Sequence, residues 1–335
     1  MPTRLMQIIL PENISNEDIP PLLSEENIIT GWSSDYPDGK KVLHLLLPAE
    51  KCEAVFDKFE RTFMETSGYN IILLPVEAIL PRPKTEEPEE KLIEEKQKND
   101  APRVSREELY ADINEGIKIS RNFMAMTILS AIVAAIGLIR NDLAVIIGAM
   151  VIAPLLTPNV ALALATTLGD TDLLRDSLKT GLTAISTAAI LSVITGMIFD
   201  INPEVPAIAS RTKLGMSDLI LALASGCAGT FAFTSGVSAV LIGVMVAVAL
   251  MPPLVVSGLL LGAGYFNLAY KALFLLMANI ICVNLSGVVT FFIQGVRPGN
   301  WWEAKKAKKS ARKAALLWTF LLIILIIIIS FGKSA

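Results

Sequence analysis

Uncharged apolar stretches fill most of the chain beyond residue 121, and the longest of them, residues 219–270, has 52 residues. A helix needs about 20 apolar residues to cross the roughly 30 Å hydrocarbon core of a bilayer. This stretch therefore predicts two spans, with a turn at Ser235-Gly236. The same reading of the other stretches predicts seven membrane-spanning helices in all: 122–139, 143–168, 178–198, 217–234, 237–264, 271–294 and 314–331.

A different pattern fills the first 80 residues, where short apolar runs alternate with polar residues and turns. Residues 50–67 predict a helix, because Val55, Phe59 and Phe63 recur at every fourth position. A shorter helix is expected over residues 15–26. Strands are expected over residues 4–10, 27–33, 40–47 and 69–80. The order βαββαβ predicts a small ferredoxin-like α+β domain.

The segment that joins the two parts has its own signals. Residues 81–100 hold three prolines, seven acids and five bases, a composition that predicts a linker without a core. A capping box formed by Ser105 and Glu108 then starts a helix. Its apolar residues recur at every fourth position, at Leu109, Ile113 and Ile117. We expect residues 103–121 to form an amphipathic helix on the cytoplasmic membrane surface, or to pack against the soluble domain.

Composition and charge agree with a membrane protein that carries a soluble appendage. Apolar residues make up 53% of the chain and charged residues 18%, and the mean hydropathy is +0.56. The net charge of −3 argues against nucleic-acid binding, which needs a basic excess. Three scattered cysteines and the single histidine, His44, cannot form a cysteine-rich or two-histidine metal site. For His44 itself, a structural role in a strand is the simpler interpretation.

The loop charges predict the orientation. With the N-terminus in the cytoplasm, the loops on that side carry 13 Lys and Arg residues, against five on the other side, as the positive-inside rule favours. The N-terminus also lacks the features of a cleaved signal peptide. Trp301 and Trp302, followed by six bases up to Lys313, predict an anchor among lipid headgroups.

The membrane part contains an internal duplication. AVIIGAMVIAPLLTP over 144–158 and AVLIGVMVAVALMPP over 239–253 are identical at eight of fifteen positions, with an offset of 95 residues. Each copy would hold three spans, and an odd number turns the second copy upside down in the bilayer, as in many transporters. The expected domains are the ferredoxin-like domain at 1–80, the linker at 81–102, the interfacial helix at 103–121, membrane repeat 1 at 122–200, membrane repeat 2 at 215–295, and a basic loop with the last span at 296–335.

The middle span of each copy is interrupted by proline, at Pro154 and Pro158 in one copy and at Pro252 and Pro253 in the other. A proline within a helix frees a backbone carbonyl, and in a membrane that carbonyl must meet protein or the water of a cavity. Paired breaks at matching positions indicate a substrate or ion pathway. A proline kink packed against its neighbours is the simpler alternative.

The first break carries a finer signal. Thr157 followed by Pro158 is typical of an N-cap residue followed by proline at the first helical position. A half-helix that starts there would point its positive end at an anion, whereas the second break has Met251 and no capping oxygen. The predicted pathway comprises Pro154, Thr157, Pro158, Asn159, Pro252, Pro253, Ser257, Asn279 and Asn284. For the last two, hydrogen bonding between helices is the alternative.

Chemistry that needs ionisable groups is not expected in the spans, because Asp, Glu, Lys, Arg and His occur only at their ends. A proton relay needs buried ionisable groups, and intramembrane hydrolysis needs a nucleophile with a base, or a metal. The sequence therefore predicts that the protein is not an enzyme, and it predicts no catalytic residue, no metal and no cofactor.

Three segments, Ser105–Leu109, Ile136–Leu138 and residues 144–158, resemble the "uncharacterized hydrophobic domain" membrane proteins, labelled domain of unknown function 389. The resemblance covers about residues 103–295. It implies a multi-pass protein of a prokaryotic inner (cytoplasmic) membrane and brings no known activity or binding residue.

Together these features predict a transporter or channel for a small solute, in particular an anion, regulated by its cytoplasmic domain. The expected partners are membrane lipid, the solute or ion, and further copies of the chain in a homo-oligomer, but not nucleic acid. The alternative is a membrane sensor or scaffold that oligomerises and transports nothing. A hydrated cavity at the breaks, lined by Thr157, Asn159 and Ser257, would favour transport.

Overall fold

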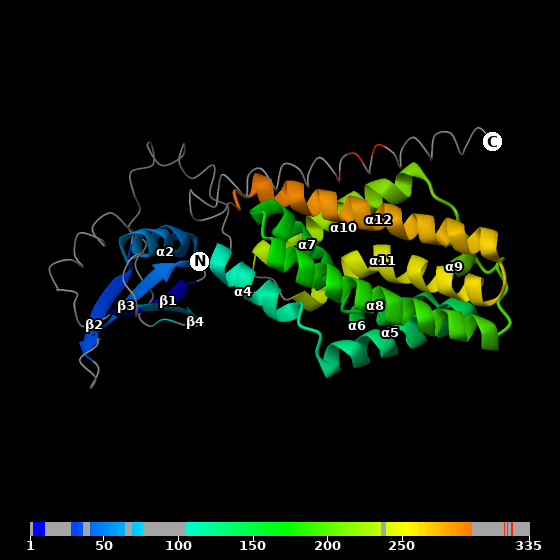
Figure 1. Cartoon of the computed structure of the whole chain (residues 1–335), viewed down its shortest axis with the longest axis horizontal. Coiled ribbons are helices and arrows are strands. Elements are labelled where there is room, and N and C mark those ends of the chain that lie inside the picture. Colours follow the sequence, from blue (N-terminus) through cyan, green and yellow to red (C-terminus); the bar gives the residue numbers. More distant parts are fainter. Residues whose placement is uncertain are drawn as a thin grey trace. The chain divides into compact units, whose positions relative to one another are not determined.

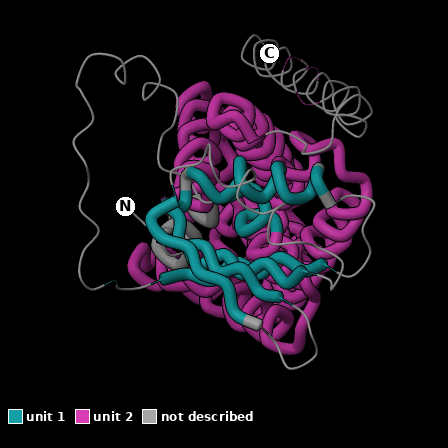
Figure 2. Tube along the Cα trace, turned by 90° about the vertical axis from the view of Figure 1, so that its left-hand side faces the viewer, with its two compact units in different colours: residues 1–110 teal, residues 111–335 magenta. Residues whose placement is uncertain are grey.

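The computed structural model describes residues 3–10, 28–35, 41–63, 69–76, 79, 105–235, 239–296, 318, 320 and 323. The chain divides into two compact units, Met1–Tyr110 and Ala111–Ala335 (Figures 1 and 2). The boundary falls inside a helix, α4 (Arg106–Gly116), rather than in the predicted linker. Four predicted features lie outside the described residues: the helix over 15–26, the linker over 81–102, the anchor at Trp301 and Trp302, and most of the span over 314–331.

The first unit contains a four-stranded antiparallel sheet with the order β2-β3-β1-β4. Its elements are β1 (Thr3–Leu10), β2 (Thr30–Asp35), β3 (Lys41–Pro48), α2 (Ala49–Phe63) and β4 (Asn70–Val76). The four predicted strands are therefore confirmed, with shifts at their ends. The central strand β1 pairs with both β3 and β4, so that Gln7 lies opposite both His44 and Ile72.

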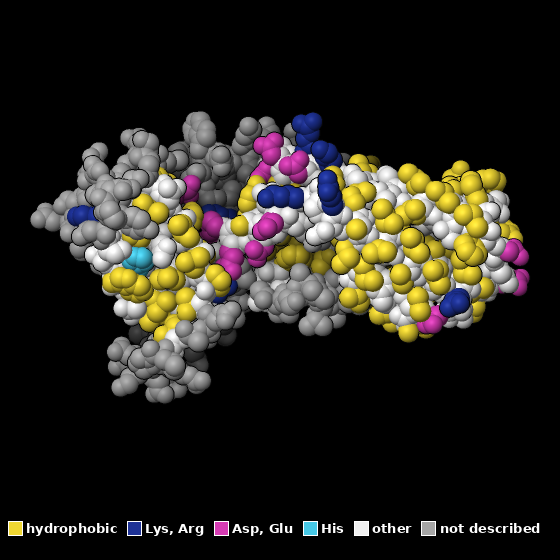
Figure 3. Space-filling model, turned by 90° about the horizontal axis from the view of Figure 1, so that it is seen from below, with side chains coloured by type: hydrophobic (Ala, Val, Ile, Leu, Met, Phe, Trp, Pro, Cys, Tyr) yellow, Lys and Arg dark blue, Asp and Glu magenta, His cyan; other side chains and the backbone are white. Residues whose placement is uncertain are grey.

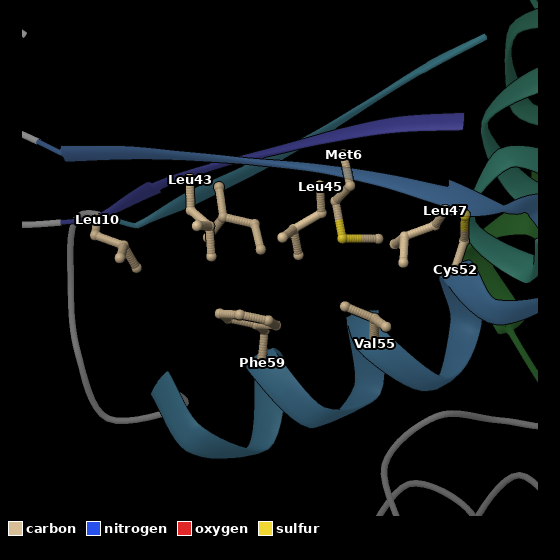
Figure 4. Packing of buried hydrophobic residues seen from close by; sticks show 9 residues of the cluster. Met6, Leu10, Leu43, Leu45, Leu47, Cys52, Val55 and Phe59 are labelled. Atoms are coloured by element: carbon tan, nitrogen blue, oxygen red, sulfur yellow. The ribbon is translucent and has the colours of Figure 1, made fainter. Parts of the chain in front are cut away.

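Helix α2 covers one face of this sheet and forms the core of the unit. Successive residues of a strand point to opposite faces, and this places alternate residues of β1 and β3 under the helix. Val55 and Phe59 of α2 face Leu43 and Leu45 of β3 across the core (Figure 4). Phe59 is fully buried. This confirms the predicted apolar face at these two positions, whereas the side chain of Phe63 lies outside those described.

His44 has a structural environment. Its ring stacks on Trp32, with 5.1 Å between ring centroids, and its Nε2 atom lies 2.8 Å from the Ser34 hydroxyl. Trp32 and His44 are direct partners across β2 and β3. The contacts are those of a cross-strand pair on the sheet, in agreement with the structural interpretation of this residue.

Ion pairs hold the first turn of α4 within the first unit. Arg4 pairs with Glu108 at 2.8 Å, and Arg106 pairs with Asp57 at 3.1 Å. The Ser105 hydroxyl accepts a hydrogen bond from the backbone N–H of Glu108, as the capping box predicts. The predicted apolar stripe is buried in protein, with exposed fractions of 3% or less for Leu109, Ile113 and Ile117. Contact of this helix with the membrane surface stays a prediction.

The second unit is helical over its described residues. Its elements are α5 (Arg121–Arg140), α6 (Leu143–Ile152), α7 (Leu156–Leu168), α8 (Thr171–Ile198), α9 (Pro206–Ala209), the 3-10 turn η1 (Ser210–Thr212), α10 (Met216–Thr234), α11 (Ala239–Gly262) and α12 (Phe266–Ile293). Four of them, α5, α8, α10 and α12, are long and apolar enough to cross a membrane. The pair α6 and α7, bent by 52°, makes a fifth if it counts as one span.

Apolar side chains cover the outside of this unit. Figure 3 shows hydrophobic side chains over the visible face of the helices, with charged side chains gathered toward the ends. On α8, Leu182, Ile190 and Met197 are 60%, 61% and 70% exposed. Such extensive apolar surface is rare on a soluble monomer and indicates contact with lipid. The protein is therefore a membrane protein, and the finer count of seven spans remains a prediction.

The helix boundaries repeat with the offset of the sequence duplication. Helices α8 (171–198) and α12 (266–293) have 28 residues each, and they start 95 positions apart. Helices α5 and α10 also start 95 positions apart. Gly169 and Gly264, at matching positions, both have positive φ angles, of 69° and 86°. The first and last helices of the two copies therefore correspond in position, and the glycine turns correspond in geometry, as well as in sequence.

Packing between the copies is reciprocal. Gly258 of α11 lies against Ser192 of α8, and Gly287 of α12 lies against Ala163 of α7. These two contacts join equivalent positions at the offset of 95. The last helix of each copy thus packs on the proline-bearing helix of the other, at sites where glycine allows close approach.

We expect Gly196→Ala to destabilise the protein by about 1–3 kcal/mol, because the added methyl group would overlap the carbonyl of Leu259 where α8 meets α11. The matched control is Gly148→Ala on α6, where a Cβ would find no atom within 4 Å and alanine favours the helix. Unfolding of both variants in detergent, followed by circular dichroism, measures the difference. Equal stability of the two would contradict close packing of α8 on α11.

Candidate binding site

The two proline-bearing helices behave differently. In the first copy the helix breaks: α6 ends at Ile152, and Ala153 is extended, with φ −65° and ψ 120°. The next residue, Pro154, lacks an N–H and disfavours the helical conformation in the residue before it, which explains the break at this point. In the second copy α11 continues through Pro252 and Pro253 without a break.

Asn279 of α12 explains how α11 tolerates Pro253. In a regular helix the N–H of residue 253 would bond to the carbonyl of Ala249, and proline has no N–H. The side-chain amide of Asn279 donates to this carbonyl instead, with an Nδ2–O distance of 2.6 Å. The freed carbonyl is therefore satisfied by a side chain from the neighbouring helix, as a membrane interior requires.

A cavity of about 260 Å³ lies beside this interaction. It is formed by η1, α10, α11 and α12, and Figure 1 shows the three helices α10, α11 and α12 within the helical unit. Its lining residues are Ser210, Arg211, Asp218, Leu221, Ala222, Ala249, Pro253, Leu275 and Asn279. Asn279 is only 5% exposed, and its Oδ1 atom has no hydrogen-bond partner among the described residues.

Arg211 supplies a cation to the cavity. Its Nη1 atom donates to the carbonyl of Ala207 at 3.0 Å and to the Ser210 hydroxyl at 2.8 Å. Its Nε and Nη2 atoms have no partner among the described residues, and no described carboxylate forms an ion pair with it. Burial lowers the pKa of the guanidinium. Because arginine stays charged nonetheless, a positive charge with unused donors borders the cavity.

Asp218 lies on the wall formed by α10. Its Oδ2 atom accepts a hydrogen bond of 2.8 Å from the backbone N–H of Gly215, which fixes the side chain at the start of the helix. The carboxylate thus caps its own helix and borders the same cavity as Arg211 without forming an ion pair with it. The lining of the cavity therefore combines one cationic, one anionic and one amide side chain.

The structure distributes the predicted pathway residues over three places. Pro253 and Asn279 line the cavity, and Pro252 is buried beside them on α11. Asn284, fully buried on α12, donates to the Asn159 side-chain oxygen at 3.1 Å, and Asn159 donates to the Leu155 carbonyl at 2.7 Å. This pair joins α12 to α7, as the alternative of interhelical bonding predicts. The others lie apart from the cavity: Pro154, Thr157 and Pro158 at the first break, and Ser257, whose hydroxyl donates to the carbonyl of Ala269.

The predicted cap at Thr157 is wrong. Helix α7 already begins at Leu156, and its N-cap, Leu155, makes no side-chain capping bond. Pro154 sets the break three residues before Thr157, so Thr157 lies inside the first turn. Its methyl group packs against Gly116 at the end of α4. The cavity lies beside Pro253 of the unbroken helix α11, so the predicted break in the second copy is wrong.

This contact changes the expected behaviour of substitutions at residue 157. Because the methyl group of Thr157 makes the contact and its hydroxyl caps nothing, Thr157→Ser and Thr157→Ala should destabilise the protein by similar amounts, about 1 kcal/mol. Thr157→Val, which keeps the methyl group, should be nearly silent in the same unfolding assay. A loss in Thr157→Ala that Thr157→Ser restores would show that the hydroxyl matters after all.

Protein fills the position in the first copy that corresponds to the cavity. At the offset of 95, Arg211 corresponds to Gly116 and Leu275 to Thr180. Gly116 packs on Thr157, and the Thr180 hydroxyl donates to the carbonyl of Ile117 at 2.6 Å. The end of α4 thus occupies the place that η1 and the cavity take in the second copy.

Sequence comparison covers the same region. The model of the family described as "Domain of unknown function (DUF389)" matches residues 150–285, a range that includes every residue lining the cavity. An uncharacterized protein of Methanocaldococcus jannaschii is 37% identical over 278 residues, which cover 83% of this chain and 84% of that protein. The chain belongs to the DUF389 family. No solved structure matches it.

Sequence reasoning missed Arg211, Ser210 and Asp218 of this DUF389 protein. Arg211 counted only as one of the bases flanking a span, and Asp218 only as a residue at a span end. One signal was available: Arg211 lies in a short connection between two apolar helices, close to Pro203 and Pro206. Such a connection can fold back onto the helices, as η1 does onto α11 and α12. Within the described ranges, no group of His, Cys, Asp and Glu side chains could hold a metal ion.

Proposed function

We propose that this protein transports or conducts a small solute with a negatively charged group across a prokaryotic inner membrane. The observation that carries the proposal is Arg211, a partly buried guanidinium with unused donors that borders a cavity. A buried cation is costly unless an anion compensates its charge. A bound anion would supply this compensation, and it would bind beside Pro253 of α11.

The duplication supports a transporter architecture. The reciprocal contacts of Gly258 with Ser192 and of Gly287 with Ala163 fit two copies related by a twofold axis. We take that axis to lie in the membrane plane, which makes a 3+3 inverted repeat, with a seventh span over 314–331. The sheet order β2-β3-β1-β4 fits a ferredoxin-like domain at the N-terminus.

The proposed orientation sets the side from which solute enters. The positive-inside rule places the N-terminus in the cytoplasm, and the connection between α8 and α10 then lies outside. This connection is tied to the turn after α5, because the Asn141 side chain accepts a hydrogen bond of 3.0 Å from the N–H of Ala207. Arg211 and Ser210 belong to the same connection. The cavity would therefore open to the outside in the state described.

Regulation by the N-terminal domain would act through α4. The first turn of this helix is held by Arg4 and Asp57 in the first unit, and its last residue, Gly116, packs on Thr157 at the break between α6 and α7. A shift of α4 along its axis would change this packing. We further propose that the protein works as a homo-oligomer in the bilayer.

Flux into proteoliposomes tests the proposal. Liposomes that contain the protein should take up labelled acetate or glycine faster than protein-free liposomes, and uptake should persist without a pH gradient, since the predicted spans hold no buried carboxylate. Uptake that requires a pH gradient would contradict the absence of a proton relay. If no organic or inorganic anion is either transported or bound, the protein is a membrane sensor or scaffold instead.

A further inference from the structure

The cavity beside Pro253 offers both a hydrogen-bond donor, Arg211, and a hydrogen-bond acceptor, Asp218, to a ligand. We infer that the solute is a zwitterion of the amino-acid class, with a carboxylate for Arg211 and an adjacent ammonium group for Asn279 and Asp218. This inference rests on the proposed function, because it specifies the ligand of the same cavity.

The donor side of the cavity suits a carboxylate. The Nε and Nη2 atoms of Arg211 are not engaged with any described residue, and a guanidinium can donate two parallel hydrogen bonds to a carboxylate. The Ser210 hydroxyl is held next to it by the 2.8 Å hydrogen bond from Nη1. A planar carboxylate fits this fork better than a spherical anion does.

The acceptor side requires a donor on the same ligand. Asn279, which lines the cavity and is 5% exposed, uses its amide nitrogen for the carbonyl of Ala249, and its buried Oδ1 atom has no partner among the described residues. An unpaired buried acceptor is costly. A simple anion has no hydrogen to donate and would leave this oxygen unpaired. An ammonium group has three donors and can reach both Asn279 and Asp218.

Charge balance leads to the same class of ligand. The cavity has Arg211 on one wall and the carboxylate of Asp218 on another, so its formal charge is zero. A monoanion would add an uncompensated negative charge near Asp218, whereas a zwitterion adds none and places each of its charges beside an opposite one. A plain amine would add an uncompensated positive charge near Arg211.

Size and wall chemistry limit the side chain of the ligand. A volume of about 260 Å³ is below the roughly 300–1,000 Å³ of pockets for drug-sized ligands. The remaining walls are apolar, at Leu221, Ala222 and Leu275. A small aliphatic amino acid such as alanine meets these limits.

Binding of three compounds of similar size to the full-length protein in lipid nanodiscs tests the inference. By isothermal titration calorimetry, alanine should bind at least tenfold more tightly than propionate, which lacks the ammonium group, and than isopropylamine, which lacks the carboxylate. Propionate binding as tight as alanine binding would overturn the inference and leave an anion site, and with it the proposed function, in place. No measurable binding of alanine, propionate or inorganic anions would overturn both.

A variant separates the charge of Asp218 from its role in the fold. Asp218→Asn keeps an oxygen that can accept the hydrogen bond from Gly215 and removes only the negative charge. The preference for alanine over propionate should shrink at least tenfold in this variant. The matched control is Asp142→Asn at the start of α6, another helix-capping aspartate, which does not line the cavity. A preference that stays unchanged in Asp218→Asn would overturn the assignment of the ammonium position.

Discussion

Arg211→Gln is expected to weaken solute binding roughly 10- to 100-fold and to lower flux by a similar factor. Hydrogen bonds to a charged group contribute about 1.5–3 kcal/mol, and each 1.4 kcal/mol changes an affinity about tenfold. Gln keeps a hydrogen-bond donor on a shorter side chain but loses the charge and the second arm of the fork. Arg211→Lys should lose less, because it keeps the charge without the fork. Titration calorimetry and proteoliposome uptake measure both effects.

The matched control for this prediction is Lys213→Gln. Lys213 is an exposed base of the same connection, two residues further along, and it does not line the cavity. Its replacement removes the same charge from the same segment, so a general electrostatic attraction of anions would be reduced equally in both variants. Equal losses in the two variants, or full activity in Arg211→Gln, would show that the guanidinium is not the anion site.

A second large effect is expected where Asn279 supports the proline-bearing helix. Asn279→Leu should destabilise the protein by about 1–3 kcal/mol, because the carbonyl of Ala249 then loses its only described donor inside the bundle. In a Pro253→Ala background the N–H of residue 253 is restored and can donate a hydrogen bond to this carbonyl in place of Asn279. The penalty of Asn279→Leu should therefore fall by about 1 kcal/mol in that background, as a double-mutant cycle would measure.

Pro252→Ala provides the control for this cycle. The restored N–H of residue 252 would donate to the carbonyl of residue 248, to which Asn279 does not donate. The penalty of Asn279→Leu should therefore stay unchanged. If both proline replacements relieve the penalty equally, the coupling reflects general straightening of α11. If neither relieves it, Asn279 stabilises the helix by some means other than the carbonyl of Ala249.

The features that sequence predicted best are those set by local composition and by the duplication. Charge-free stretches gave the approximate limits of α5, α8, α10 and α12, because lipid contact restricts composition along a whole span. The offset of 95 residues, found in the sequence, recurs in the start positions of α8 and α12. Strands β1 to β4 followed from short apolar runs between turns, which are also local signals.

The errors arose where two local signals competed or where contacts are distant in sequence. Thr157 with Pro158 has the composition of a cap, but the conformation that Pro154 imposes on Ala153 starts the helix earlier. Neither the contact of Asn279 with Ala249, 30 residues apart, nor the entry of Arg211 into the cavity leaves any periodic pattern in the sequence.

The proposed function depends most on a cavity beside Pro253 that is open to water and biased toward anions by Arg211. The direct test uses Ser210→Cys, at an exposed position on the lining, in a protein whose half-buried Cys227 is replaced by serine. Cys52 and Cys282 are buried, and burial raises the pKa of Cys52 to about 12, so both should react slowly at neutral pH.

The measurement compares the rates at which a negatively and a positively charged methanethiosulfonate reagent modify this cysteine. The account predicts that the negative reagent reacts about tenfold faster, and that the additional replacement Arg211→Gln abolishes this preference whereas Lys213→Gln leaves most of it. Equal rates for the two reagents, or a preference that survives Arg211→Gln, would contradict the account.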